Sequence, residues 1–77
     1  MSKSKKWPDN FSLAGRPHIP LHNLLQLEGW CESGGTAKHT IDAGVVRVDG
    51  EVELRRRAKI VVGQLVQLAG QKVLVTE

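Results

Sequence analysis

The chain has 77 residues, of which 40% are hydrophobic and 25% are charged, and its 11 basic and 8 acidic side chains give a net charge of +3. These values are ordinary for one soluble globular domain, and no stretch approaches the roughly 20 apolar residues of a membrane span. A single cysteine, Cys31, excludes an intrachain disulfide and leaves a zinc site short of ligands, so we expect a reduced, cytoplasmic protein without metal or cofactor.

The first ten residues are polar, lack periodicity and contain three lysines. Polar residues follow the lysines where a secretory signal peptide would have an apolar core. We therefore predict a flexible basic arm over residues 1–10 and a single domain over residues 11–77. Residues 1–20 carry four basic side chains and one acidic side chain, whereas residues 21–77 carry seven of each. The N-terminal part thus holds the whole charge excess.

Two short extended segments are predicted before the first helix. Phe11 and Leu13 alternate with Ser12, which indicates a short strand or an anchor laid on the core. Pro17 and Pro20 bracket an extended dipeptide, because proline fixes its own φ and restricts the residue before it.

The residues after Pro20 predict a helix, since the apolar positions have helical spacing: Leu21, Leu24, Leu25 and Leu27. Pro20 suits the position before a helix, and Gly29 can end the helix in the left-handed conformation. We expect Leu27 to fill a second apolar side of this helix. Trp30 is expected to fold back onto the helix as the largest core residue.

A second helix is predicted at about residues 33–43. Ser33 is a good N-cap, and Gly44 is a good residue to follow the last turn. Ala37, Thr40 and Ile41 give the helix its buried stripe.

Beyond Gly44 the apolar period changes to two, which predicts a hairpin around Asp49-Gly50. A two-residue turn there would place Glu51 and Glu53 on the buried face. We therefore predict a three-residue loop with Gly50 in the left-handed conformation and Val46 opposite Val52.

The last hairpin is predicted to have an even loop, because its four apolar residues share a face only in that case: Val66, Leu68, Val73 and Val75. A type II′ turn at Gly70-Gln71 would pair Leu68 with Val73. Residues 59–62 are a further strand candidate, ended by Gly63. The predicted fold class is α+β, with two short helices packed on a small antiparallel sheet of about four strands and the other sheet face toward solvent.

The spacing of apolar and glycine residues resembles the alpha-L RNA-binding motif, the domain first known from ribosomal protein S4. The resemblance rests on these residues: Leu21, Leu24, Leu25, Gly29, Ser33, Ala37, Ile41, Gly44, Val46, Val48, Gly50, Lys59, Ile60 and Gly63. Residues 32–38 and 48–53 are more specifically similar to the small stand-alone bacterial members of the YbcJ type. The resemblance covers roughly residues 17–70, and Asp49 departs from it where many relatives have asparagine. It implies a helix pair on a small sheet, RNA binding across the second helix and the first hairpin, and no catalytic chemistry.

The start of the second helix is a candidate phosphate site, formed by Ser33, Gly34 and Gly35. Helix N-termini present free N–H groups and a partial positive charge, which favour anions. The alternative is that Ser33 only caps the helix and the glycines only relieve the preceding loop. Under the resemblance Lys38 is a phosphate ligand, and His39 is either an RNA contact or a solvated histidine.

A basic cluster after the first hairpin is the second candidate site, with no acid inside it: Arg55, Arg56, Arg57 and Lys59. It is either the footprint of a polyanion or a solvated hairpin end. Strand alternation would point Arg55 and Arg57 to one side and Arg56 to the other. We predict that Arg55, Arg57 and Lys38 share one face, with the Gly34-Gly35 amides at its edge. Arg47 would join this site or, as its expected role, pair with Glu53 across the strands.

The main functional hypothesis is a non-catalytic, monomeric RNA-binding protein that recognises structured RNA, with ribosomal and transfer RNA both left open. No catalytic motif such as GxSxG, HExxH or a P-loop is present. The alternative is a protein-interaction adaptor that docks a partner on its sheet or on an edge strand. Salt dependence separates the two, because phosphate contacts weaken steeply with salt.

Overall fold

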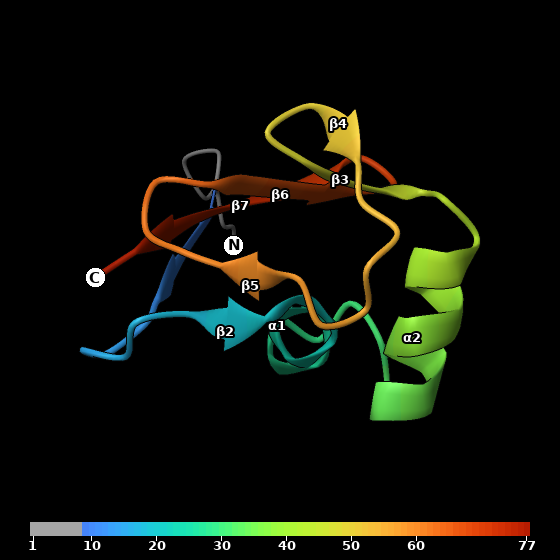
Figure 1. Ribbon diagram of the computed structural model, residues 1–77, viewed down its shortest axis with the longest axis horizontal. Helices are drawn as coiled ribbons and strands as arrows, with labels where there is room; N and C mark the ends of the chain where they lie inside the picture. Colours follow the sequence, from blue (N-terminus) through green and yellow to red (C-terminus); the bar gives the residue numbers. More distant parts are fainter. Residues whose placement is uncertain (1–8) are drawn as a thin grey trace, which may run out of the picture.

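The computed structural model describes residues 9–77 and places two helices on one side of a mixed sheet (Figure 1). The elements are β1 (Asp9–Ser12), β2 (Ile19–Pro20), α1 (Leu21–Leu27), α2 (Gly34–Asp42), β3 (Val46–Val48), β4 (Glu51–Val52), β5 (Lys59–Ile60), β6 (Leu65–Leu68) and β7 (Gln71–Thr76). The five-stranded sheet has the order β1-β7-β6-β3-β4, and β2 pairs with β5 in a separate two-stranded sheet. The predicted α+β class is confirmed. The expectation of about four antiparallel strands was incomplete, because two strands precede the helices and β1 runs parallel to β7.

Strand β1 begins before the predicted start of the domain. Its pairing with β7 includes Asp9 and Asn10, so two residues assigned to the arm belong to the sheet. Phe11 packs against the core and Leu13 is buried, which confirms the predicted strand and anchor. Residues 1–8 lie outside the described residues, and the flexible arm stays a prediction for them.

Helix α1 is short and depends on the residues it buries. Leu21, Leu24 and Leu25 are fully buried, whereas seven residues alone would not hold a helix in water. Gly29 has a φ of 79°, which confirms the predicted left-handed end. Leu27 is 62% exposed, so the expected second apolar side was wrong: no element among the described residues buries it. Trp30 is half-buried and packs against the core from its margin, so the expectation that it would be the largest core residue was also wrong.

Helix α2 agrees with the prediction to within one residue at each end. The Ser33 hydroxyl accepts a hydrogen bond from the Thr36 N–H at 3.1 Å, as an N-cap does. Ala37 and Ile41 are fully buried, and Gly44 follows the helix with a φ of 78°.

The first hairpin has a two-residue turn, and the predicted three-residue loop was wrong. Asp49 and Gly50 have φ values of 53° and 87°, the type I′ conformation, and Val48 lies opposite Glu51. The acids do lie on the core side of the sheet, but β4 is the edge strand, where Glu51 is exposed and Glu53 is only half-buried. Val52 lies opposite Arg47 on the outer face and is 46% exposed.

The last hairpin has the predicted even loop with a different turn. Ala69 and Gly70 have φ values of 51° and 86°, which again is type I′, so Val66 rather than Leu68 lies opposite Val73. The predicted shared face is confirmed, since the four apolar residues are all buried: Val66, Leu68, Val73 and Val75. The strand candidate at residues 59–62 is shortened to β5, which pairs with β2 outside the main sheet.

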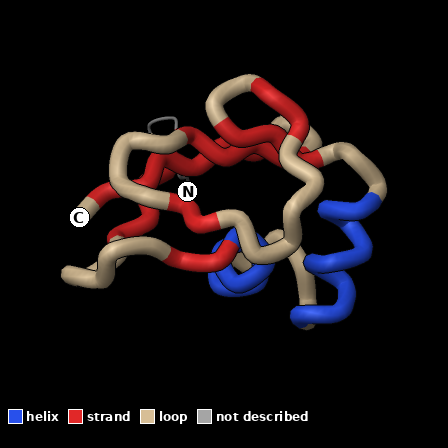
Figure 2. The backbone as a smooth tube through the Cα atoms, viewed as in Figure 1, coloured by secondary structure: helices blue, strands red, loops and turns tan. Residues whose placement is uncertain are grey.

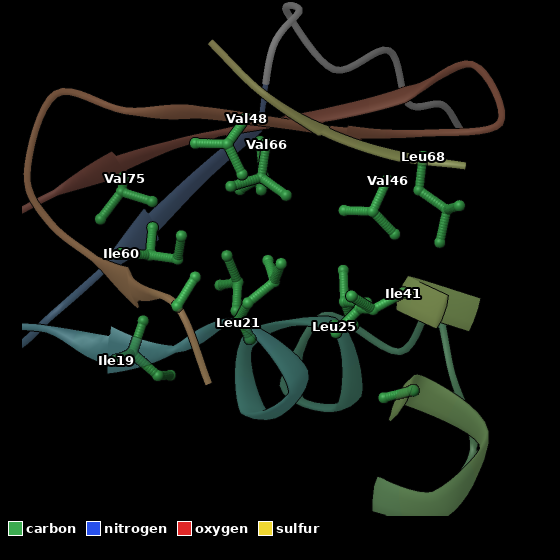
Figure 3. Packing of buried hydrophobic residues seen from close by; sticks show 14 of the residues in the cluster. Ile19, Leu21, Leu25, Ile41, Val46, Val48, Ile60, Val66, Leu68 and Val75 are labelled. Atoms are coloured by element: carbon green, nitrogen blue, oxygen red, sulfur yellow. The ribbon is translucent and has the colours of Figure 1, made fainter. Parts of the chain in front are cut away.

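The core lies between the five-stranded sheet and the helices (Figure 3). Val46, Val48 and Val66 point from the sheet toward Leu21 and Leu25 of α1. The small β2-β5 sheet and α2 close the sides of this core with three further residues, which are Ile19, Ile60 and Ile41. Across residues 9–77, neither helix has the length and apolar character needed to cross a membrane.

Candidate functional site

The start of α2 is open to solvent and held by its cap. The Ser33 hydroxyl lies 3.1 Å from both the Thr36 N–H nitrogen and the Thr36 hydroxyl oxygen, and Gly35 is exposed. A Cβ at Gly34 would lie 3.7 Å from the Gln26 Oε1 atom, and one at Gly35 would meet nothing closer than 3.9 Å. Neither glycine is therefore required by packing. Their lack of side chains leaves the first N–H groups of α2 accessible.

Farther along α2, Lys38 and Asp42 lie one turn apart and therefore share a side of the helix. Lys38 is half-buried and His39 is exposed. Asp42 accepts hydrogen bonds from Arg56, with 3.0 Å between Arg56 Nε and Asp42 Oδ1 and a second bond from Arg56 Nη2 to Asp42 Oδ2. These bonds, aided by the positive charges of Arg56 and His39, outweigh the opposing effect of desolvation and hold the pKa of Asp42 below its ordinary value.

Residues 53–58, which we call the arginine loop, run from β4 alongside α2 to β5 (Figures 1 and 2). Their backbone caps α1. The Leu21 N–H donates to the Ala58 carbonyl at 2.9 Å, and the His22 N–H donates to the Arg56 carbonyl at 3.1 Å. The His22 Nδ1 atom also lies 3.1 Å from the Arg56 carbonyl oxygen. Because Pro20 supplies no side-chain cap, this loop satisfies N–H groups that α1 cannot satisfy itself.

Arg55 is bound to the acid at the start of the arginine loop. Its Nε lies 3.0 Å from Glu53 Oε2 and its Nη2 lies 3.1 Å from Glu53 Oε1, a two-point contact between guanidinium and carboxylate. The Arg55 N–H adds a third bond to Glu53 Oε2. The side-chain bonds from Arg55 are the main reason why the pKa of Glu53 lies below its ordinary value.

Arg55, Arg57, Ala58 and Lys59 line an open pocket of about 490 Å³. No side chain within residues 10–77 forms a hydrogen bond or ion pair with the side chain of Arg57 or Lys59. The expected strand alternation was wrong in its cause, since residues 53–58 form a loop with a turn at Arg56 and Arg57. The structure nevertheless separates Arg56, which is bonded to Asp42 of α2, from Arg55 and Arg57, which line the pocket.

Arg47 lies on the other face of the sheet from Lys38 and the helices. It alternates with the buried Val46 and Val48, so its side chain points to the face of the sheet opposite the helices. Its Nη1 donates to the Gly50 carbonyl at 3.2 Å, and Glu53 is bound to Arg55 instead. The expected Arg47–Glu53 pair was therefore wrong, because Val52, and not Glu53, lies opposite Arg47.

Three residues with defined roles near the site were not predicted from the sequence: Asp42, Glu53 and Asp49. The first two hold Arg56 and Arg55. Glu53 could have been found because it lies two positions before Arg55, whereas Asp42 lies fourteen positions before Arg56 and has no such signal. Asp49 fixes the first hairpin to β6, since its Oδ1 accepts from the Leu65 N–H at 2.9 Å and its own N–H donates to the Leu65 carbonyl at 2.8 Å. Asp commonly uses its side chain in this way at turns.

Comparison with known proteins assigns a family to this architecture. The sequence matches the S4 domain over residues 11–76. It is 57% identical over 65 residues to the Escherichia coli K12 protein named "Putative RNA-binding protein YbcJ", across 84% of this chain and 93% of that protein. The same identity and coverage relate it to the Shigella flexneri protein named "Uncharacterized protein YbcJ".

A solved structure extends the similarity to three dimensions. The solution structure of E. coli YbcJ, described as revealing an ALFAL motif involved in RNA binding, matches with a TM-score of 0.73 and 49% identity. The match covers 100% of this chain and 98% of that chain. These findings confirm the resemblance that the sequence indicated.

Proposed function

The chain belongs to the S4 domain family, and from this premise we propose that it is a non-catalytic RNA-binding protein that recognises structured RNA through phosphate contacts and shape. The observation that carries the proposal is the whole-chain similarity to E. coli YbcJ, whose structure is described as containing a motif involved in RNA binding. The basic residues of α2 and of the arginine loop supply the groups that such a motif needs.

The proposed RNA surface runs from the start of α2 to β5. It consists of Ser33, Gly34, Gly35, Lys38, His39, Arg55, Arg56, Arg57 and Lys59. The Arg56–Asp42 pair supports its continuity, because it joins the arginine loop to the side of α2 that carries Lys38. Arg47 is proposed as an outlying contact for RNA that reaches around the first hairpin.

Recognition by shape is favoured over stacking on bases. Aromatic residues make up only 4% of the chain, and Phe11 and Trp30 are both half-buried against the core. Single-stranded RNA is usually read on exposed aromatic side chains, whereas helical RNA is read through phosphates and shape. We propose a monomer that acts in the cytoplasm on ribosomal or transfer RNA.

The test replaces Arg55, Arg56 and Arg57 together by glutamine. A filter or fluorescence titration with structured RNA at several salt concentrations should show a large loss of affinity and a flatter salt dependence. The fold should survive, because the caps of α1 come from backbone carbonyls, and the exposed Arg56–Asp42 pair contributes little to stability. Glu53 loses the guanidinium of Arg55 but keeps the bond from the backbone N–H of residue 55, so some loss of stability is expected and unfolding is not. A variant with a normal thermal melt and unchanged RNA binding would contradict the proposed surface.

The adaptor remains the alternative, and one observation favours it. Val45 and Leu54 are 51% and 60% exposed, and a Cβ at Gly44 would lie 3.9 Å from Leu54 Cδ2, so exposed Leu54 of the arginine loop lies beside the backbone at Gly44, next to exposed Val45. Binding of a protein partner through this surface would depend weakly on salt. Leu54→Ser would then abolish binding, and the arginine variant would retain it.

A further inference from the structure

The basic residues around the arginine loop are not equivalent. Arg55 is held by Glu53 and Arg56 by Asp42, so each of these positive charges already faces a carboxylate. Arg57 and Lys59 have no such partner among the side chains of residues 10–77. An incoming anion competes with a carboxylate at the first two positions and with no described carboxylate at the last two.

The backbone under Arg57 and Lys59 is fixed on both sides. Ala58 lies between them and is 5% exposed, its carbonyl accepts from Leu21, and its N–H donates to the Arg55 carbonyl at 3.2 Å. Lys59 belongs to β5 and is paired with Pro20 of β2. The side chains of Arg57 and Lys59 therefore extend from a rigid backbone segment and line one open pocket. This rigidity lowers the entropy cost of ordering the two side chains around a ligand.

We propose that Arg57 and Lys59, at the pocket that Arg55 walls, form a binding site for one phosphate group, and that Arg56 is a positioning residue that holds the arginine loop on α2. This site deepens the proposed function and rests on it. The shared chemistry is a phosphate anion, which an RNA supplies either within its backbone or at a phosphorylated 5′ end.

The first experiment compares Arg57→Gln with Arg16→Gln. Arg16 is exposed, and its loss removes the same charge. The loop between β1 and β2 that carries it lies at the opposite end of the molecule from α2 (Figure 1). Arg57→Gln should weaken RNA binding about ten-fold or more and reduce the log–log salt slope by about 0.7. Arg16→Gln should change the affinity less than three-fold. Equal effects of the two variants would overturn the site.

The second experiment tests the role of Arg56. Arg56→Gln should lower affinity with the salt slope unchanged, because no phosphate contact is removed. Asp42→Asn should also lower affinity, since it breaks the same pair, whereas Glu51→Gln neutralises an exposed acid of β4 without this effect. A slope reduced by about 0.7 in Arg56→Gln, or tighter binding by Asp42→Asn than by Glu51→Gln, would show that Arg56 is itself a phosphate ligand and would overturn the assignment.

The third experiment separates this site from the proposed function and identifies the source of the phosphate. Pyrophosphate added to the full chain should shift the amide signals of residues 57–59 in nuclear magnetic resonance spectra, and not in Arg57→Gln. Absent shifts would overturn the site even if the protein binds RNA, and shifts without RNA binding would refute the proposed function alone. The affinity is then measured for the same RNA prepared with a 5′ phosphate and with a 5′ hydroxyl. A preference for the 5′ phosphate that Arg57→Gln abolishes assigns the site to a terminal phosphate. Equal affinity for the two RNAs assigns it to a backbone phosphate.

Discussion

The carboxylate of Glu53 shows how a single acid is accommodated on the core side of the sheet. Its side chain is only 18% exposed, yet it receives three bonds from Arg55, two from the guanidinium and one from the backbone. A half-buried carboxylate is costly unless its oxygens are bonded in this way. Arg55, which the sequence suggests as an RNA contact, is thus also the main partner of Glu53. This contact offsets part of the cost of the two-residue turn at Asp49-Gly50, which places Glu53 on the core side.

The lowered pKa of Glu53 gives a prediction about pH. A carboxylate whose pKa is lowered in the folded state stabilises the protein fully at pH values above its ordinary pKa of 4.5. That stabilisation is lost as the pH falls through the pKa of the folded state. The wild-type protein should therefore lose more stability between pH 7 and pH 3 than Glu53→Gln does. Thermal melts of both proteins at the two pH values measure the difference, and Glu51→Gln, on an exposed acid of β4, is the control. Parallel pH dependence in wild type and Glu53→Gln would show that the pair contributes nothing.

At the scale of elements, both main hairpins use type I′ turns in which the first central residue is not glycine. Asp49 and Ala69 have φ values of 53° and 51°. Asp49 tolerates this conformation and gains a bond to Leu65, whereas alanine has no polar group to offset the crowding of its Cβ. Ala69 is therefore a position where the backbone is held by the pairing of β6 with β7.

Replacing Ala69 by asparagine should stabilise the protein. Asn-Gly is the preferred type I′ sequence, and a positive φ costs an ordinary L-residue roughly 1–2 kcal/mol, of which asparagine recovers a part. We expect the free energy of unfolding to rise by about 0.5–1 kcal/mol in urea or thermal denaturation. Ala43→Asn is the control, because Ala43 is also exposed but has a φ of −72°. A gain of the same size in both variants would show that turn conformation is not the cause.

The sequence predicted those elements whose ends carry their own signals. Ser33 marks the start of α2, Gly44 marks its end, and Gly29 marks the end of α1. These ends are predictable because a cap hydroxyl and a positive φ are requirements of the local backbone. The hairpin registers could not be predicted in the same way. Val52 could face outward and Glu53 inward only because β4 is an edge strand and Arg55 reaches Glu53, and both facts are tertiary.

The candidate site was predictable in composition and not in geometry. The cluster of basic residues from Arg55 to Lys59 was evident in the sequence, and the structure does place Arg55 and Arg57 at one pocket. No local pattern indicates that Arg56 is joined to Asp42, fourteen positions away, or that the backbone of the arginine loop caps α1. Both contacts depend on how the chain returns from the sheet to the helices.

At the scale of the whole molecule, the charge is divided between the fold and the residues before it. Residues 9–77 contain eight basic and eight acidic side chains, so the three lysines of residues 1–8 equal the net charge of +3. The fold itself attracts a polyanion only where its charges are locally unbalanced, as at Arg57 and Lys59. Arg57 and Lys59 of the fold would then set where the protein binds on the RNA, and Lys3, Lys5 and Lys6 would increase the general attraction between the protein and any RNA.

The last prediction is a deletion of residues 1–8, which spares the pairing of β1 with β7 and the packing of Phe11 against the core. We expect an unchanged thermal midpoint and a similar loss of affinity for every RNA tested. The log–log salt slope should fall by at most about 2, at roughly 0.7 for each lysine that neutralises a phosphate.

Full-length protein with Lys3, Lys5 and Lys6 replaced by glutamine is the matched variant, because it removes the charge and keeps the chain. Equal losses in the two proteins, measured by competition between a hairpin and an unrelated stem, would assign the effect to charge. If the deletion instead changes which RNA is preferred, residues 1–8 contribute to recognition and the division between fold and lysines is wrong.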